Sequence, residues 1–184
     1  METTWNVQLI RCRRKSVGIR IDGTGEITVR APLRMPETEI RKVLESKRSW
    51  IEKTLAKISS RPQLPKLTAE EVNALADRAL KEIPPRVAAW ARQMGVTYGR
   101  ITIRNQKTRW GSCSAKGNLN FNCLLMLCPE DVLDYVIVHE LCHRKELNHS
   151  VRFWTEVARI LPDYKQPLKW LKNEGQSIIA RINS

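Results

Sequence analysis

The sequence predicts an α+β fold in which two groups of short strands are each followed by helices. Apolar residues recur at every second position over residues 4–30, and again over residues 101–103 and 119–125, which is the period of a half-buried strand. The stretches that follow these strands carry apolar residues three and four positions apart, which is the period of an amphipathic helix. Segments with the strand period and segments with the helix period alternate along the chain, so we expect strands and helices to pack together in each hydrophobic core.

A polar stretch divides the chain between these groups. Residues 59–65 contain two prolines and no apolar period, which is typical of a linker. We therefore expect a segment of strands and helix over residues 1–65 and a separate domain over residues 66–184. A content of 42% hydrophobic residues in 184 is sufficient for a core of this size.

The N-terminal segment should contain three strands and one helix. An Asp-Gly-Thr-Gly turn at residues 22–25 predicts a hairpin between the second and third strands. The basic run at residues 11–15 lies between the first two strands, where it is either a solvated hairpin tip or a phosphate-binding cluster. Pro36 opens a helix whose apolar stripe includes Trp50, so we expect Trp50 in the core.

The second domain should open with a long helix. Thr68 and Glu71 have the spacing of a capping box, and Gly95 has the position of a C-terminal stop. Pro84 and Pro85 lie inside this helix and should break or kink it, because proline lacks a backbone N–H.

Two strands are expected next, over residues 96–104 and 119–125, with a loop between them. The loop combines cations, an indole, a glycine and small hydroxyls, which is unusual for a simple connection. We expect Arg109, Trp110 and Ser112 to line a substrate cleft. The alternative is that Trp110 packs in the core and the loop serves folding.

A His-Glu-x-x-His motif is the most informative stretch of the chain. His139 and His143 are four residues apart, so on a helix they face one metal ion. Glu140 is placed to reach a water molecule on that metal. Catalytic zinc takes three protein ligands, and the third histidine of the chain, His149, completes the set if the helix ends near Asn148.

Helix signals surround this motif. Pro129, followed by two acidic residues, should open the metal helix, Ser150 should cap the next helix, and Pro167 should begin the last helix. The five cysteines form no Cys-x-x-Cys pair, and their odd number favours reduced thiols. A second zinc site, built from Cys113, Cys123 and Cys128, is the less favoured alternative.

The composition restricts location and partners. The chain has 32 Lys and Arg against 19 Asp and Glu, a net charge of +13, which favours a polyanionic partner such as nucleic acid, a nucleotide or an acidic substrate. The alternative is a soluble basic surface without a partner. No apolar run is long enough for a membrane span and no signal-peptide pattern begins the chain, so we expect a cytoplasmic protein without membrane attachment.

Several motifs together resemble one family. Arg-Trp-Gly-Ser-Cys-Ser at residues 109–114, Asp-Tyr-Val-Ile-Val-His-Glu-Leu-Cys-His at 134–143, Asn-His-Ser at 148–150 and Pro-Asp-Tyr at 162–164 resemble the YgjP-like predicted zinc metallopeptidases. These proteins are relatives of the SprT-like and WLM proteins among the zincins. The resemblance implies a minimal zincin fold, a small sheet backed by helices of which one carries the metal.

The same resemblance assigns the site residues. It implies that His139, His143 and His149 bind zinc and that Glu140 is the catalytic glutamate. Glu146 stands where metzincins have glycine, and no methionine follows His149, so the chain does not resemble a metzincin.

Three functions are compatible with such a site. The first is a zinc peptidase acting on peptide or protein, with the strand at residues 119–125 as an edge to which an extended peptide adds. The second is a zinc hydrolase of a nucleotide or phosphate ester, for example a nucleoside triphosphate pyrophosphatase. The third is a nucleic-acid-associated protein whose zinc is structural. For either hydrolase, Arg109 and Tyr164 are candidates to stabilise the developing oxyanion.

Overall fold

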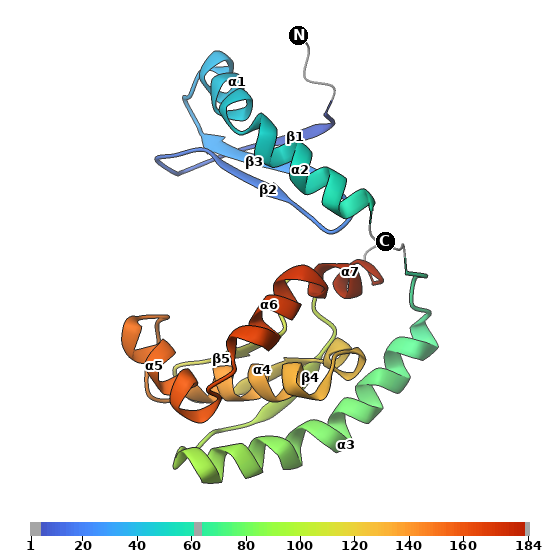
Figure 1. Ribbon diagram of the computed structural model, residues 1–184, viewed down its shortest axis with the longest axis vertical. Coiled ribbons are helices and arrows are strands. Elements are labelled where there is room, and N and C mark those ends of the chain that lie inside the picture. Colours follow the sequence, from blue (N-terminus) through green and yellow to red (C-terminus); the bar gives the residue numbers. More distant parts are fainter. Residues whose placement is uncertain (1–4, 61–63, 183–184) are drawn as a thin grey trace. The chain divides into compact units, whose positions relative to one another are not determined.

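The computed structural model describes residues 5–60 and 64–182 (Figure 1). It contains strands and helices in two compact units, Met1–Leu64 and Pro65–Ser184, and it confirms the predicted α+β class. Residues 61–63, in the middle of the expected linker, lie outside the described residues.

The first unit contains a three-stranded sheet of β1 (Val7–Cys12), β2 (Gly18–Ile21) and β3 (Ile27–Pro32). The strand order is β1-β3-β2, and the central strand β3 is parallel to β1 and antiparallel to β2. The predicted hairpin is present between β2 and β3. The Asp22 carboxylate accepts hydrogen bonds from the backbone N–H groups of Thr24 and Glu26.

The basic run at residues 11–15 does not lie at a hairpin tip, so this alternative is wrong. Because β1 pairs with β3 rather than with β2, the run forms a crossover between two strands that are not neighbours. The Arg11 guanidinium also has a local role, since its Nη1 donates to the carbonyls of Pro32 and Met35, at 3.2 and 2.6 Å.

Two helices, α1 (Glu37–Ser46) and α2 (Arg48–Ser59), replace the single helix expected here. The break lies at Lys47, whose backbone angles of −105° and 5° are not helical. Ile51 and Leu55 of α2 face the core of this unit, and this turns Trp50 toward solvent with an exposed fraction of 47%. The prediction of a buried Trp50 is therefore wrong.

The second unit begins with the long helix α3 (Ala69–Met94). The Thr68 capping box and the left-handed Gly95 at its C-terminus are both present, as predicted. Pro84 and Pro85 do not break the helix, which continues through them as a curved rod (Figure 1). Residues on either side of the prolines, including Ile83 and Val87, are fully buried, so tertiary packing holds this turn in place.

The second sheet consists of β4 (Ile101–Arg104), β5 (Gly111–Cys113) and β6 (Leu119–Asn122), in the order β4-β6-β5. The segment expected as a loop therefore contains a strand, β5. The strand expected over residues 119–125 ends at Asn122 and continues as a 3-10 helix, η1 (Cys123–Leu127). Because β6 is central, it is not the edge strand that we expected; β5 and β4 form the edges.

Four further helices complete the unit: α4 (Glu130–Cys142), α5 (Val151–Ile160), α6 (Lys165–Asn173) and α7 (Gly175–Ala180). The last predicted helix is thus divided in two. Helix α4 is buried over most of its length against α3, α5, α6 and the sheet. No helix of the described residues combines the length and the apolar character that a membrane span needs.

Candidate metal centre

Three histidine side chains converge at the C-terminal end of α4. The nitrogen atoms that His139, His143 and His149 present lie within 4.8 Å of one another. The Nε2 atoms of His139 and His149 are 3.0 Å apart. Two neighbouring ligands of a tetrahedral zinc ion, each about 2.05 Å from the metal, are separated by about 3.3 Å. The cluster therefore has the dimensions of a metal site.

The chain turns sharply to bring His149 back to the helix. Helix α4 ends at Cys142, earlier than the end near Asn148 that the sequence predicts. The backbone N–H groups of Lys145 and Glu146 then donate to the Cys142 carbonyl and form a tight turn. Ser150 caps α5 as expected, because its hydroxyl accepts a hydrogen bond from the Phe153 N–H.

Hydrogen bonds orient two of the three imidazole rings. His143 Nδ1 lies 3.0 Å from the Glu146 carbonyl, to which it donates, so His143 Nε2 is free to bind a metal. The Tyr135 hydroxyl lies 3.5 Å from His139 Nδ1, on the side of that ring away from His149. Such partners fix the tautomer and direct the opposite nitrogen to the centre.

Aromatic rings pack against the three histidines. The Phe153 ring lies 4.6–4.9 Å from all three imidazole centroids. Trp154 stacks on His149 at 5.9 Å, and Tyr164 stacks on Trp154 at 5.6 Å. Through these contacts Phe153, Trp154 and Tyr164 pack against the histidine cluster.

The environment favours the neutral form of His139 and His143. Burial, together with the neighbouring His143 and His149, lowers the pKa of His139 to about 3. Burial also lowers the pKa of His143. Neutral imidazole is the form that binds metal, so the donor set fits a divalent cation such as zinc.

Glu140 lies beside this cluster and against the sheet. Its side chain is buried, with an exposed fraction of 5%, and burial raises its pKa to about 8, while the charge of Arg109 opposes this rise. Gly111 of β5 makes this position possible: a Cβ atom added there would lie 2.7 Å from Glu140 Oε1 and 2.8 Å from its Cγ. A side chain at position 111 would displace the carboxylate.

The four residues expected to bind substrate lie in different environments. Arg109 is exposed and close enough to influence Glu140. The Trp110 ring packs against the core and faces Gly175 of α7, which corresponds to the packing alternative. The Ser112 hydroxyl accepts from Asn120 Nδ2, and it lies on the opposite face of β5 from Gly111 because successive strand residues alternate. Tyr164 stacks on Trp154, which in turn stacks on His149.

Sequence reasoning missed two residues of this region. Tyr135 precedes His139 by one helical turn, so the i, i+4 rule that paired the histidines would also have placed it beside His139. For Gly111 the sequence predicts only a place in a loop. Its contact with Glu140 depends on how β5 packs on α4, which no local pattern in the sequence indicates.

The chain matches a known protein family. The model of the YgjP-like family, described as a metallopeptidase domain, matches residues 15–75 and 67–174. The fold is also similar to the metallopeptidase zymogen abylysin of Pyrococcus abyssi (22% identity, 51% of this chain and 96% of that chain, TM-score 0.46). Jannalysin of Methanocaldococcus jannaschii, also a metallopeptidase zymogen, gives 23% identity over 48% of this chain and 95% of its own, with a TM-score of 0.41.

No curated protein matches the chain significantly. The family model, in contrast, covers most of the length of both units, including the three histidines and Glu140. Members of a metallopeptidase family require a metal ion, and the histidine cluster supplies the donors for one. The chain therefore belongs to the YgjP-like metallopeptidase family.

Proposed function

We propose that the protein is a zinc-dependent peptidase in which His139, His143 and His149 hold the metal and Glu140 is the general base. The observation that carries this proposal is the convergence of three imidazole nitrogens beside one buried carboxylate. Among residues 5–60 and 64–182, no cysteine, aspartate or glutamate joins the three histidines as a fourth ligand. This favours an open catalytic position over closed structural coordination.

Zinc fits the donor set better than a hard cation does, because three neutral imidazoles and no carboxylate form it. When bound, zinc lowers the pKa of a water molecule to about 7 and polarises the carbonyl oxygen that is attacked. The chain's own residues then need only to position a substrate and move protons.

Glu140 is the residue that moves the proton. Its carboxylate follows the first histidine on α4 and is held against Gly111, so it has little freedom to turn away from the cluster. Burial raises its pKa to about 8, so the ionised carboxylate is a stronger base than an ordinary glutamate. The carboxylate takes a proton from the attacking water and delivers it to the leaving amine.

The free edge of β5 offers a place for the peptide backbone. The Asn122 N–H donates to the Trp110 carbonyl and the Ser114 N–H donates to the Asn118 carbonyl. In an antiparallel pair the bonded residues alternate, so Gly111 and Cys113 direct their N–H and C=O groups away from β6. An extended peptide that pairs with these groups would pass directly beside Glu140.

Digestion of an unstructured protein by the zinc-loaded enzyme tests this proposal. We expect new peptide fragments in mass spectra, and no fragments after chelation. Glu140→Gln keeps the size of the side chain but cannot accept the proton, so turnover should fall by roughly 100- to 10,000-fold while zinc stays bound. His149→Ala should lose zinc and activity together.

Two results would contradict the proposal. Near-wild-type turnover by Glu140→Gln would exclude Glu140 as the base, and full zinc retention by His149→Ala would remove this residue from the metal site. A nucleoside triphosphate is the appropriate second substrate, because pyrophosphate release without peptide cleavage would favour the phosphate-ester alternative.

We also propose that the protein works in the cytoplasm. All five cysteines are free thiols, including the buried Cys123 and Cys142. Unpaired cysteines are typical of reducing compartments.

A further inference from the structure

The sheet beside Glu140 lies in a part of the chain that has no acidic residue. No aspartate or glutamate occurs between Glu82 and Glu130, a stretch that includes β4, β5, β6 and all of their connections. The same connections carry several lysines and arginines. Apart from Glu140 itself, a substrate lying along this sheet would therefore meet only positive charge from the strands and their loops.

Three of these cations flank the free edge of β5. Lys107 and Arg109 lie just before the strand and Lys116 just after it, and all three are exposed. None of the three has an ion-pair partner within residues 5–60 and 64–182. They differ in this from Lys145 and Arg159, which both form ion pairs with Glu156.

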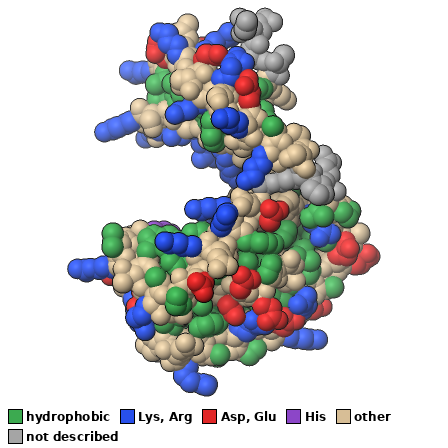
Figure 2. Space-filling model, in the orientation of Figure 1, with side chains coloured by type: hydrophobic (Ala, Val, Ile, Leu, Met, Phe, Trp, Pro, Cys, Tyr) green, Lys and Arg blue, Asp and Glu red, His purple; other side chains and the backbone are tan. Residues whose placement is uncertain are grey.

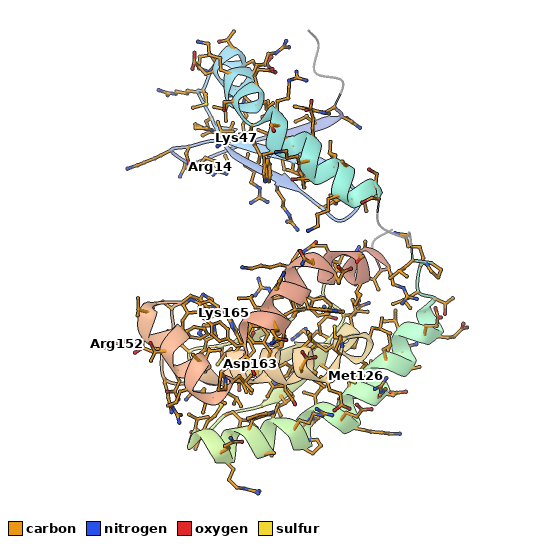
Figure 3. All side chains as sticks on the ribbon, viewed as in Figure 1. Arg14, Lys47, Met126, Arg152, Asp163 and Lys165 are labelled. Carbon is orange, nitrogen blue, oxygen red and sulfur yellow. The ribbon has the colours of Figure 1, made fainter. Side chains whose placement is uncertain are left out.

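A fourth cation is fixed at the C-terminal end of the same strand. Arg144 Nε donates to the Thr97 carbonyl at 2.9 Å and its Nη1 donates to the Ala115 carbonyl at 3.4 Å. These partners are neutral, so the positive charge of the guanidinium remains uncompensated. In Figure 2, Lys and Arg side chains lie near the visible histidine. Arg152 of α5 and Lys165 of α6 are two further cations, both labelled in Figure 3.

We infer that the site selects peptide segments with acidic side chains on both sides of the bond that is cut. This inference rests on the proposed function, because it assumes that a peptide pairs with β5. A strand advances about 3.3 Å per residue, so peptide side chains two or three positions from the scissile bond lie beside the cations that flank β5. Carboxylates at these positions find partners there, whereas lysines are repelled.

Two peptides that differ only in their flanks test the inference. Both have the same neutral centre, and one carries glutamates and the other lysines on each side. At low salt we expect kcat/KM for the zinc enzyme to be at least about tenfold higher with the glutamate peptide. The ratio should approach one near 1 M salt, where the screening length falls to about 3 Å.

Charge reversal locates the effect. The double variant Lys107→Glu/Lys116→Glu should lower the ratio to near one or below, and Arg109→Glu should lower it in the same direction. The matched control is Lys81→Glu, an exposed cation on α3 without an ion-pair partner among the described residues, which should leave the ratio unchanged. Circular dichroism and zinc content show whether each variant folds and retains its metal.

The outcomes separate the inference from the proposed function. If both peptides are cut equally well, the acidic preference is wrong while the peptidase function stands. If neither peptide is cut, the proposed function itself fails. If a nucleoside triphosphate is consumed while both peptides stay intact, the cations serve phosphate groups and the inference is overturned.

Discussion

The sheets of the two units have the same strand order but different partners. In each sheet the third strand is central, parallel to the first and antiparallel to the second. In the N-terminal unit, α1 buries Ile40 and Leu44, α2 buries Ile51, and both helices leave their outer faces exposed. In the C-terminal unit, α4 is buried on nearly all sides and carries His139 and Glu140, and His143 directly follows its last residue.

This difference shows that the topology of the sheet does not determine the chemistry. The first residue of the second strand is glycine in both sheets, Gly18 in β2 and Gly111 in β5. Gly18 accommodates the guanidinium of Arg14, and Gly111 accommodates the carboxylate of Glu140. The same backbone position thus accommodates a partly buried cation in one sheet and the proposed catalytic base in the other.

Metal removal should have the largest effect, because it should lower the thermal stability of one unit and leave that of the other unchanged. We propose that residues 1–65 and 66–184 are distinct folding domains. A metal held at 1,000 times its Kd stabilises the domain that binds it by about 4 kcal/mol. Calorimetry should therefore show two transitions, of which a chelator lowers only one.

His149→Ala provides the control for this experiment, because a chelator should no longer shift either transition of that variant. A single transition that moves as a whole when the metal is removed would mean that the units fold as one domain. The two units would then be compact regions of one cooperative folding domain.

The two equivalent glycines give the second prediction. In Gly111→Ala the new Cβ would lie within 3.0 Å of three atoms of the buried Glu140, so the carboxylate must move. A displacement of about 1 Å in a catalytic group costs on the order of 100-fold in turnover. In Gly18→Ala the close atoms, at 2.8 Å, are the terminal nitrogens of Arg14, which belong to a flexible side chain.

We therefore expect Gly111→Ala to bind zinc normally and to lose most of its kcat, while Gly18→Ala keeps wild-type turnover. Zinc content and steady-state kinetics on the same preparation measure both quantities. Equal turnover in the two variants would show that Gly111 is not needed to position Glu140.

Features with a local cause were predictable from the sequence. The Thr68 capping box, the left-handed Gly95 and the turn at residues 22–25 each depend on side chains within a few positions of one another. The spacing of His139 and His143 belongs to the same class, since a single helical turn brings their ring centroids to 5.1 Å.

Features that depend on distant contacts were not predictable. An alternating pattern shows which face of a strand is buried but not which strand lies beside it, so β6 was expected at an edge although it is central. The break at Lys47 has no proline or glycine near it, and the continuation of α3 through Pro84 and Pro85 depends on packing. For the same reason Gly111 acquires its role only when β5 meets α4.

The smallest effect is expected on the uncovered face of the N-terminal sheet. Ile27, Val29 and Ala31 of β3 are buried, so the alternate residue Arg30 lies on the other face. The register places Arg20 of β2 on that face as well, and both arginines are exposed. We propose that this face binds single-stranded nucleic acid weakly through phosphate contacts, each of which contributes about 0.7 to the salt dependence of log K.

Arg20→Glu/Arg30→Glu should therefore reduce the slope of log K against log salt by about 1.4, measured by fluorescence anisotropy with an oligonucleotide at low salt. The matched control is Arg41→Glu/Lys53→Glu, which changes the net charge by the same amount on exposed positions of α1 and α2. If the control reduces the slope equally, binding reflects net charge and not the sheet face. If the unmodified protein does not bind the oligonucleotide even at low salt, the positive charge of this unit serves solubility and not nucleic-acid binding.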